Sequence, residues 1–160
     1  MEYQINIHYS FIADNENEAK EKAKDYVSNN LQIKPVLEGV YSPAQVAEKC
    51  KSFRSKKKEY FCVFFLDTQN HITGKEVISI GTLNASLIHP RETFRTAVVK
   101  NCCSVIVAHN HPSGSLEPSE EDIAVTKRLK DAGKLLGIEV LDHVIVTVGA
   151  HTSLRDKGLM

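Results

Sequence analysis

Apolar runs in the second half of the chain have the length and composition of strands. Residues 104–108 form a short run rich in β-branched side chains, which is typical of a buried strand. Residues 60–66 are apolar and aromatic, and residues 71–80 follow them after the turn sequence DTQN, so the two segments predict a hairpin. Residues 139–148 predict a further strand.

Helical patterns lie between these strands, and each has a recognisable beginning. Residues 42–53 start with a Ser-Pro pair, which supplies an N-cap and a proline in the first turn. A second helix is predicted to begin at Pro90. A third covers residues 119–136 and is followed by Gly137, where a left-handed C-cap residue is expected. No glycine-rich phosphate loop accompanies this alternation of strands and helices, which favours an α/β fold that does not bind nucleotides.

The first forty residues differ from the rest of the chain. A weak alternation of apolar and polar residues over residues 3–11 predicts a strand, and residues 14–30 predict a surface helix with a narrow apolar stripe. We therefore expect a small strand-helix extension at residues 1–40 and a main domain at residues 41–160.

Composition restricts the class of protein without selecting one. The 160 residues include 42% hydrophobic ones, enough for a core, and 20 basic residues balance 20 acidic ones. A balanced charge provides no overall field that would attract DNA or a membrane. The chain has no apolar run of about twenty residues and no secretory signal pattern at its start, so we expect no membrane association and a cytoplasmic location.

Two local features each have two interpretations. The basic run at residues 54–59 is expected to be a solvated loop, although it could also contact phosphates. The four cysteines form no C-x-x-C pair, which makes a thiolate zinc site improbable, and Cys102 and Cys103 are expected to be buried thiols.

The segment HNHPSGSLEPSEED, residues 109–122, concentrates side chains that bind metals. His109 and His111 are two residues apart at the end of a predicted strand, so they share a face. Asp122 follows in the first turn of the next helix. Two imidazoles and a carboxylate are a donor set that suits zinc, and catalytic zinc has three protein ligands and an open fourth position. We predict His109, His111 and Asp122 as zinc ligands.

Simpler interpretations exist for the same residues. Ser119 and Asp122 also fit a capping box at a helix N-terminus, a role that is compatible with metal binding. His89 is either a fourth ligand or a structural residue at a helix start. Asp142 could support a metal-ligating imidazole, or it could make only local hydrogen bonds.

The spacing of these residues resembles a known family. H-x-H-x7-S-x2-D resembles the JAMM metalloprotease motif of the MPN (JAB) superfamily, and AHNHPSG followed by PS-x-x-D resembles the RadC branch. The similarity continues through the GT pair at residues 81–82, HPRE at residues 89–92 and LDHVIV at residues 141–146, and covers the chain from about residue 42. It implies an MPN-type (cytidine-deaminase-like) α/β fold, with a curved mixed sheet flanked by helices and the zinc site at the sheet edge and a helix N-terminus.

The resemblance also implies an activity: a zinc-dependent hydrolase that cleaves amide or isopeptide bonds of an unidentified peptide or protein. By analogy with the family, Glu76 would be the general base that accepts a proton from the zinc-activated water, and Ser119 would stabilise the oxyanion. Taken without the resemblance, Glu76 is an ordinary solvent-facing strand residue.

Two other functions remain open at this stage. The RadC branch carries a DNA-repair label, which suggests a nucleic-acid-associated protein or a metal-dependent phosphodiesterase. Longer RadC-like proteins have a helix-hairpin-helix module that this sequence lacks, and this weakens a role on DNA. A non-catalytic MPN scaffold is the third possibility, and the sequence leaves the oligomeric state open.

Overall fold

The computed structural model describes residues 14–30, 39–40, 42–81 and 88–160, with residues 27–30 described by their backbone only. Contacts divide the chain into two compact units, Met1–Val36 and Leu37–Met160. In the first unit, helix α1 spans Glu16–Asn30, as predicted, and the Asn15 side chain accepts a hydrogen bond from the Glu18 amide at 3.0 Å. The strand predicted at residues 3–11 lies outside the described residues.

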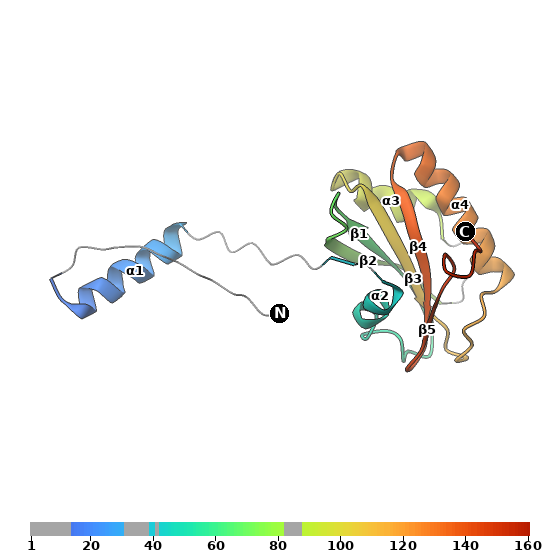
Figure 1. The fold of residues 1–160 in the computed structure, drawn as a ribbon, viewed down its shortest axis with the longest axis horizontal. Coiled ribbons are helices and arrows are strands. Elements are labelled where there is room, and N and C mark those ends of the chain that lie inside the picture. Colours follow the sequence, from blue (N-terminus) through green and yellow to red (C-terminus); the bar gives the residue numbers. More distant parts are fainter. Residues whose placement is uncertain (1–13, 31–38, 41, 82–87) are drawn as a thin grey trace. The chain divides into compact units, whose positions relative to one another are not determined.

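The described part of the second unit is built on a five-stranded mixed sheet (Figure 1). The strand order is β2-β1-β3-β4-β5, with β3 in the middle and the sheet open at both edges. Only β3 and β4 are parallel, and the other neighbours are antiparallel. The elements are α2 Pro43–Lys49, β1 Glu59–Leu66, β2 Ile72–Gly81, α3 Pro90–Val99, β3 Ser104–Asn110, α4 Glu120–Leu136, β4 Glu139–Val146 and β5 His151–Ser153. This arrangement confirms the predicted α/β fold of flanked mixed-sheet type.

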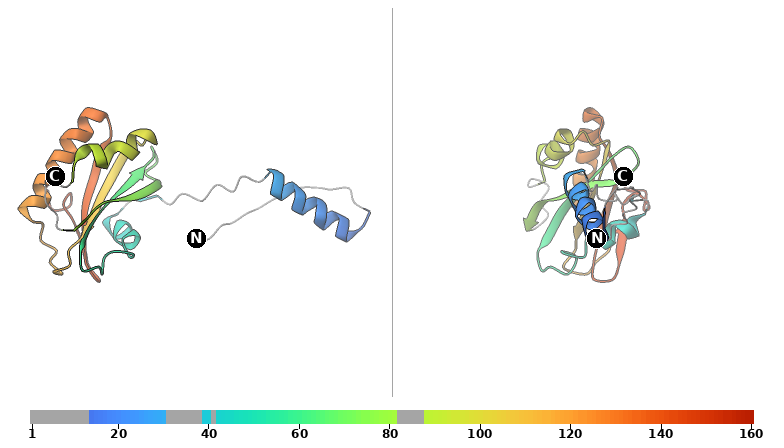
Figure 2. Two further views of the ribbon diagram at one scale, coloured as in Figure 1. Left: turned by 180° about the vertical axis from the view of Figure 1, so that it is seen from behind. Right: turned by 90° about the vertical axis from the view of Figure 1, so that its left-hand side faces the viewer.

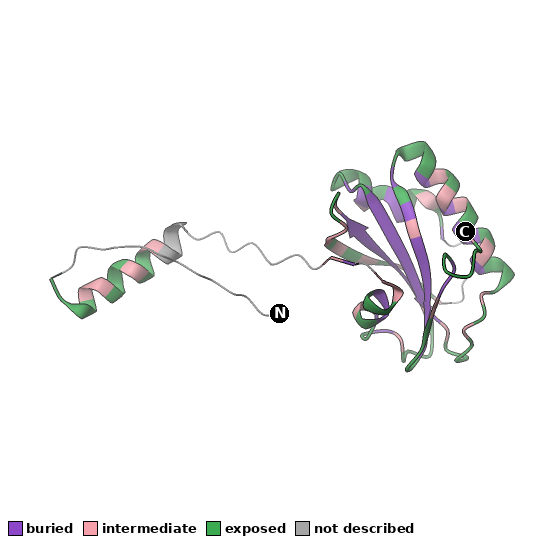
Figure 3. Cartoon of the chain, viewed as in Figure 1, coloured by how far each residue is buried: buried purple, intermediate pink, exposed green. Residues whose placement is uncertain are grey.

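Helices cover both faces of the sheet, so the core has two layers (Figure 2). On one face, Val63 of β1 and Val107 of β3 pack with α3 and α4. On the other face, Phe64 and Ala108 pack with α2. Strands β1 and β3 are therefore buried along almost their whole length (Figure 3), which explains why their sequences are continuous apolar runs.

The register of the central strands positions the functional segment. Strands β1 and β2 form the predicted hairpin. On the other side of β1, Phe61 is level with His109 of β3. Because β3 and β4 are parallel, the ends of both strands lie at the same end of the sheet, and Asn110 is level with Val146. The two histidines thus lie at the end of the central strand. The prediction of a site at the sheet edge holds for this end of the sheet and does not refer to an edge strand.

Caps determine where the helices begin and end. Ser119 caps α4, and Gly137 ends it with φ 69°, a left-handed conformation that favours glycine. Gly133 lies so close to the start of β4 that a Cβ atom would be 2.4 Å from the Ile138 carbonyl oxygen. Helix α2 ends at Lys49, earlier than predicted, because hydrogen bonds of the i to i−3 type turn the chain from Cys50 onward.

Two further expectations can be compared with the described residues. Within them, no helix combines the length and the apolar character needed to cross a membrane. Cys50, Cys62 and Cys102 are buried, but Cys103 is exposed, so the expectation of two buried thiols before β3 was wrong for Cys103.

Candidate metal centre

Strand β3 and the start of α4 bring three predicted ligands together. His109 Nε2 is 3.2 Å from Asp122 Oδ1, and His111 Nε2 is 3.4 Å from Asp122 Oδ2. One potential ligand atom from each of His109, His111 and Asp122 lies within 4.8 Å of the others. His109 and Asp122 are buried, while His111 is partly exposed, so the cluster is accessible from one side.

The helix cap orients Asp122 without using both of its oxygen atoms. Asp122 Oδ2 accepts hydrogen bonds from the Ser119 amide at 2.8 Å and the Ser119 hydroxyl at 2.7 Å, and the Asp122 amide donates to Ser119 Oγ at 3.1 Å. This is the predicted capping box. It leaves Oδ1 directed at His109, so the two interpretations of Asp122 are compatible in this geometry.

The protonation states of His109 and Asp122 favour cation binding. Burial is the main reason that the pKa of His109 lies well below its ordinary value, so the ring is neutral near pH 7. Burial opposes ionisation of Asp122, but hydrogen bonds from His111 and Ser119 outweigh it and hold the pKa of the carboxyl below its usual range. The hydrogen bond to Asp122 raises the pKa of His111, and the charge of Glu59 acts in the same direction.

Two buried acceptor atoms face each other at the centre of the cluster. Among the described side chains, His109 Nε2 and Asp122 Oδ1 are the buried polar atoms without a hydrogen-bond partner. When the proton of the neutral His109 ring is on Nδ1, which lies 2.8 Å from His143 Nε2, the 3.2 Å contact brings two lone pairs together with no proton between them. Such unsatisfied buried acceptors cost about 1–3 kcal/mol each, and a divalent cation would satisfy both. The residues therefore fit a divalent metal ion.

A polar pocket of about 350 Å³ opens beside the cluster. The side chains that line it are three carboxylates, three serines and one histidine: Glu59, His111, Ser113, Ser115, Ser119, Glu121 and Asp122. Ser119, the predicted oxyanion-stabilising residue, is therefore at the site. No lysine or arginine lines the pocket, which makes it more suitable for a neutral or cationic group than for an anion.

Glu59 is a site residue that the sequence interpretation missed. It is the first residue of β1, two residues before Phe61, which is level with His109, and it lines the pocket together with His111. Asn110, between the two histidines, holds this segment in place: its carboxamide accepts from the Tyr60 amide at 2.7 Å and donates to the carbonyls of Lys56 and Lys58 at 3.1 Å.

Glu76 lies elsewhere on the sheet. It is half-buried on β2, where it accepts a hydrogen bond from Thr96 Oγ1 at 2.6 Å and is 3.5 Å from the Arg95 guanidinium, both on α3. In the sheet, Glu76 is level with Val63 of β1, whereas Phe61 is level with His109. The structure thus brings together four of the five predicted site residues but not Glu76, whose catalytic role stays a prediction.

Other polar residues near the site have structural contacts. His89 caps α3, with its Nδ1 atom accepting from the Arg91 amide at 3.2 Å, which agrees with the structural interpretation. Asp142 accepts from Ser153 Oγ and from the His143 amide, so its hydrogen bonds are local. The partner of the His109 ring is instead His143, at 2.8 Å.

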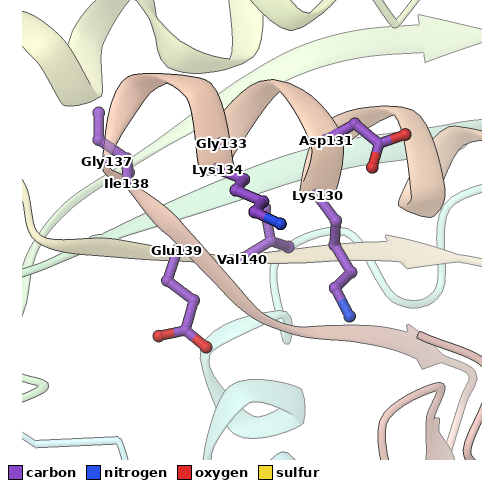
Figure 4. Close-up of a pocket in the computed structure, with 8 residues that line it drawn as sticks. All are labelled: Lys130, Asp131, Gly133, Lys134, Gly137, Ile138, Glu139 and Val140. Atoms are coloured by element: carbon purple, nitrogen blue, oxygen red, sulfur yellow. The ribbon is translucent and has the colours of Figure 1, made fainter.

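A second depression lies at the other end of the sheet. It has a volume of about 520 Å³ between the last turns of α4 and the start of β4, where Lys130, Lys134 and Glu139 line it (Figure 4). Its charges are mixed, and its lining residues include no histidine or cysteine. Among the described residues, the group of side chains that could hold a metal ion therefore lies at the end of the sheet that carries His109 and His111.

Sequence comparisons agree with this assignment of the fold. A family model described as the RadC-like JAB domain matches residues 40–159, which include the whole cluster and pocket. The UPF0758 protein of Methanosarcina mazei is 53% identical over 107 residues, covering 67% of this chain and 47% of that protein. The UPF0758 protein of Desulfitobacterium hafniense is 44% identical over 143 residues, covering 89% of this chain and 62% of that protein.

A third relative, UPF0758 protein ABC2615 of Shouchella clausii, is 46% identical over 127 residues, covering 79% of this chain and 54% of that protein. The chain spans about half the length of the Methanosarcina and Shouchella relatives. None of these three names states an activity.

Proposed function

Because this chain belongs to the RadC-like JAB domain family, we propose that His109, His111 and Asp122 form the zinc centre of a hydrolase that cleaves amide bonds. The observation that supports this most strongly is the pair of unsatisfied buried acceptors, His109 Nε2 and Asp122 Oδ1, beside an accessible polar pocket. A zinc ion held by three such ligands supplies a Lewis acid and lowers the pKa of a coordinated water to about 7.

Asn110, Glu59 and Ser119 are the residues to which the remaining roles in the reaction are assigned. Asn110 fixes the backbone around Glu59, so that the Glu59 carboxylate stays in the pocket next to His111. We assign to Glu59 the transfer of a proton from the attacking water to the leaving amine. The Ser119 hydroxyl donates to Asp122 Oδ2, so it orients the carboxylate. A role of Ser119 toward an oxyanion requires that bond to be exchanged.

An amide substrate suits the pocket better than a phosphodiester. Glu59, Glu121 and Asp122 would repel a phosphate, and among the pocket-lining residues no basic side chain compensates. The leaving group of amide hydrolysis is an amine, which gains a positive charge when it is protonated. A carboxylate-lined pocket favours that charge.

Metal analysis tests the zinc centre directly. We expect about one zinc ion per chain in the wild type and none in a His109→Ala/His111→Ala double variant, because among the described residues these three form the donor set. His89→Ala is the matched control and should retain zinc, since His89 caps α3. Affinity should fall between about pH 8 and about pH 6, because the pKa of His111 is raised and its proton competes with the metal.

Two results would contradict the zinc centre. One is zinc that remains bound to the double variant at the wild-type level. The other is a wild-type chain that takes up no metal after zinc has been supplied, and this would favour a capped turn in a non-catalytic scaffold.

One observation favours a second candidate, nucleic-acid binding. The Asn110 carboxamide holds the backbone carbonyls of Lys56 and Lys58, so exposed lysines at residues 56–58 lie next to the strand end that carries the histidines. Because the net charge is zero and the pocket is acidic, we expect band-shift assays to show no binding at low salt. Binding that weakens as salt increases and is lost in a Lys56→Ala/Lys57→Ala/Lys58→Ala variant would establish this second function.

A further inference from the structure

A second fully buried histidine, in addition to His109, lies behind the metal cluster. His143 is on β4, level with Val107 of β3, and its side chain is fully buried. Its Nε2 atom is 2.8 Å from His109 Nδ1, and its Nδ1 atom is 2.6 Å from Thr126 Oγ1 on α4. The Thr126 hydroxyl in turn donates to the Asp122 carbonyl oxygen at 2.6 Å. A series of hydrogen bonds therefore leads from His109 through His143 and Thr126 to the backbone carbonyl of Asp122.

The number of protons on each group determines which atom donates and which accepts in this series of hydrogen bonds. A carbonyl oxygen only accepts, so the single proton of the Thr126 hydroxyl is used on Asp122. Thr126 Oγ1 must then accept from His143, which places a proton on His143 Nδ1. In a neutral His143, Nε2 carries no proton and accepts a hydrogen bond from His109 Nδ1.

The same pattern of donors and acceptors determines the state of His109. With its proton on Nδ1, the ring presents a bare Nε2 atom toward Asp122 Oδ1, in agreement with the absence of a hydrogen-bond partner at either atom. The ring cannot easily turn, because Phe61 stacks on it with a centroid distance of 6.3 Å and an interplanar angle of 17°. The His109 side chain is also fully buried.

We propose that His143 and Thr126 are positioning residues that fix His109 in the Nδ1-protonated tautomer, so that its Nε2 lone pair is available to a metal ion before the ion arrives. The proposal rests on the zinc centre for its purpose, but the tautomer itself is a property of the metal-free protein. It also gives Thr126, a polar residue on the buried side of α4, a function that packing alone does not explain.

The test compares Thr126→Val with Thr126→Ser in the full chain. Valine has nearly the shape of threonine but removes the hydroxyl, and serine retains it. In metal-free protein with ¹⁵N-labelled imidazoles, long-range ¹H–¹⁵N correlation spectra should show His109 protonated at Nδ1 in the wild type and in Thr126→Ser. Thr126→Val should show a mixture of tautomers. Zinc affinity, measured by competition with a chromophoric chelator, should fall about 10- to 100-fold in Thr126→Val and stay close to wild type in Thr126→Ser.

A second variant keeps the test decisive if Thr126→Val does not fold. In His143→Gln, the carboxamide oxygen can accept from His109 Nδ1–H while its NH₂ group donates to Thr126. We expect this variant to retain the His109 tautomer and to bind zinc more tightly than His143→Leu does. Equal zinc affinities in the glutamine and leucine variants would overturn the proposal.

The tautomer measurement separates this inference from the proposed function. If the wild type binds no zinc, His109 protonated at Nδ1 and a mixture in Thr126→Val still support the positioning role. If the wild type binds zinc but metal-free His109 is protonated at Nε2, the positioning role is wrong and the zinc centre is unaffected. Unchanged tautomer and affinity in Thr126→Val would equally overturn it.

Discussion

Glu59→Gln should lower the turnover of the zinc-loaded protein by about 10²- to 10⁴-fold while zinc remains bound. The carboxylate lines the pocket next to His111 but is not one of the three clustered ligand residues. Glutamine has the same shape and cannot accept a proton, so the loss should be in kcat and not in metal content. The assay is any peptide or isopeptide that the wild type cleaves, with zinc content measured on the same samples.

Glu76→Gln is the matched control, since it makes the same change at the other candidate base. Glu76 contacts Thr96 and Arg95 of α3, so we expect the variant to retain most activity and to lose at most the stability of two half-exposed contacts. The opposite pattern, an active Glu59→Gln and an inactive Glu76→Gln with zinc bound, would return the general-base role to Glu76.

Asp122→Asn should separate metal binding from folding. The variant replaces a charged ligand by a neutral one, and we expect zinc affinity to fall by more than about 100-fold, beyond the range typical of residues that only support a ligand. The new amide group can donate a hydrogen bond to His109 Nε2, at the position where two acceptors now face each other. The folded protein also stabilises the charged carboxylate, because the pKa of Asp122 is lowered. We therefore expect the metal-free asparagine variant to be less stable than the wild type but clearly more stable than Asp122→Ala.

Two of the contributions to this stability difference have known magnitudes. Satisfying a buried acceptor contributes about 1–3 kcal/mol, and losing a negative charge in the first helical turn costs about 0.3–1 kcal/mol. Urea unfolding with a chelator at about pH 8, above the ordinary pKa of histidine, measures the difference. Asp122→Ala is the control, because it also loses the cap interactions with Ser119 and should be destabilised. If the metal-free asparagine and alanine variants had the same free energy of unfolding, the contact between the two facing acceptors would not destabilise the wild type.

Continuous apolar runs and helix caps were sufficient to predict most of the domain. The buried strands β1 and β3 were predicted because they are covered on both faces, and such strands leave a run that is visible in the sequence. Helix α4 was predicted from its serine N-cap and its glycine C-cap, which the structure has at Ser119 and Gly137. The cluster of His109, His111 and Asp122 was predicted because the three residues are close in sequence as well as in space.

Glu59 could not be found in the same way. It follows three lysines, and a carboxylate there has the composition of a solvated loop. Its place at the site depends on the antiparallel register of β1 with β3, which no local pattern specifies. Strand pairing across about fifty residues of sequence is a tertiary property, so no sequence pattern indicated Glu59, and the family resemblance indicated Glu76.

Thr126 did leave a signal that was overlooked. The buried residues of α4 are Asp122, Val125, Thr126, Leu129 and Gly133, a helical stripe with two polar members. A threonine in phase with core residues indicates a buried hydrogen bond, and here its hydroxyl contacts His143. Leu136, the last residue of the helix, is 51% exposed because the helix ends there.

The exposed Cys103 is a position at which a fluorescent label could report whether the site holds a metal ion. Burial raises the pKa of Cys50 and, to about 12, that of Cys62, so neither thiol forms a reactive thiolate near pH 7. Cys103 immediately precedes β3, and His109 lies near the far end of that strand, roughly 20 Å away at about 3.3 Å per residue. A fluorophore coupled to Cys103 would be within quenching range of a cobalt ion at the histidines, without contact with any ligand.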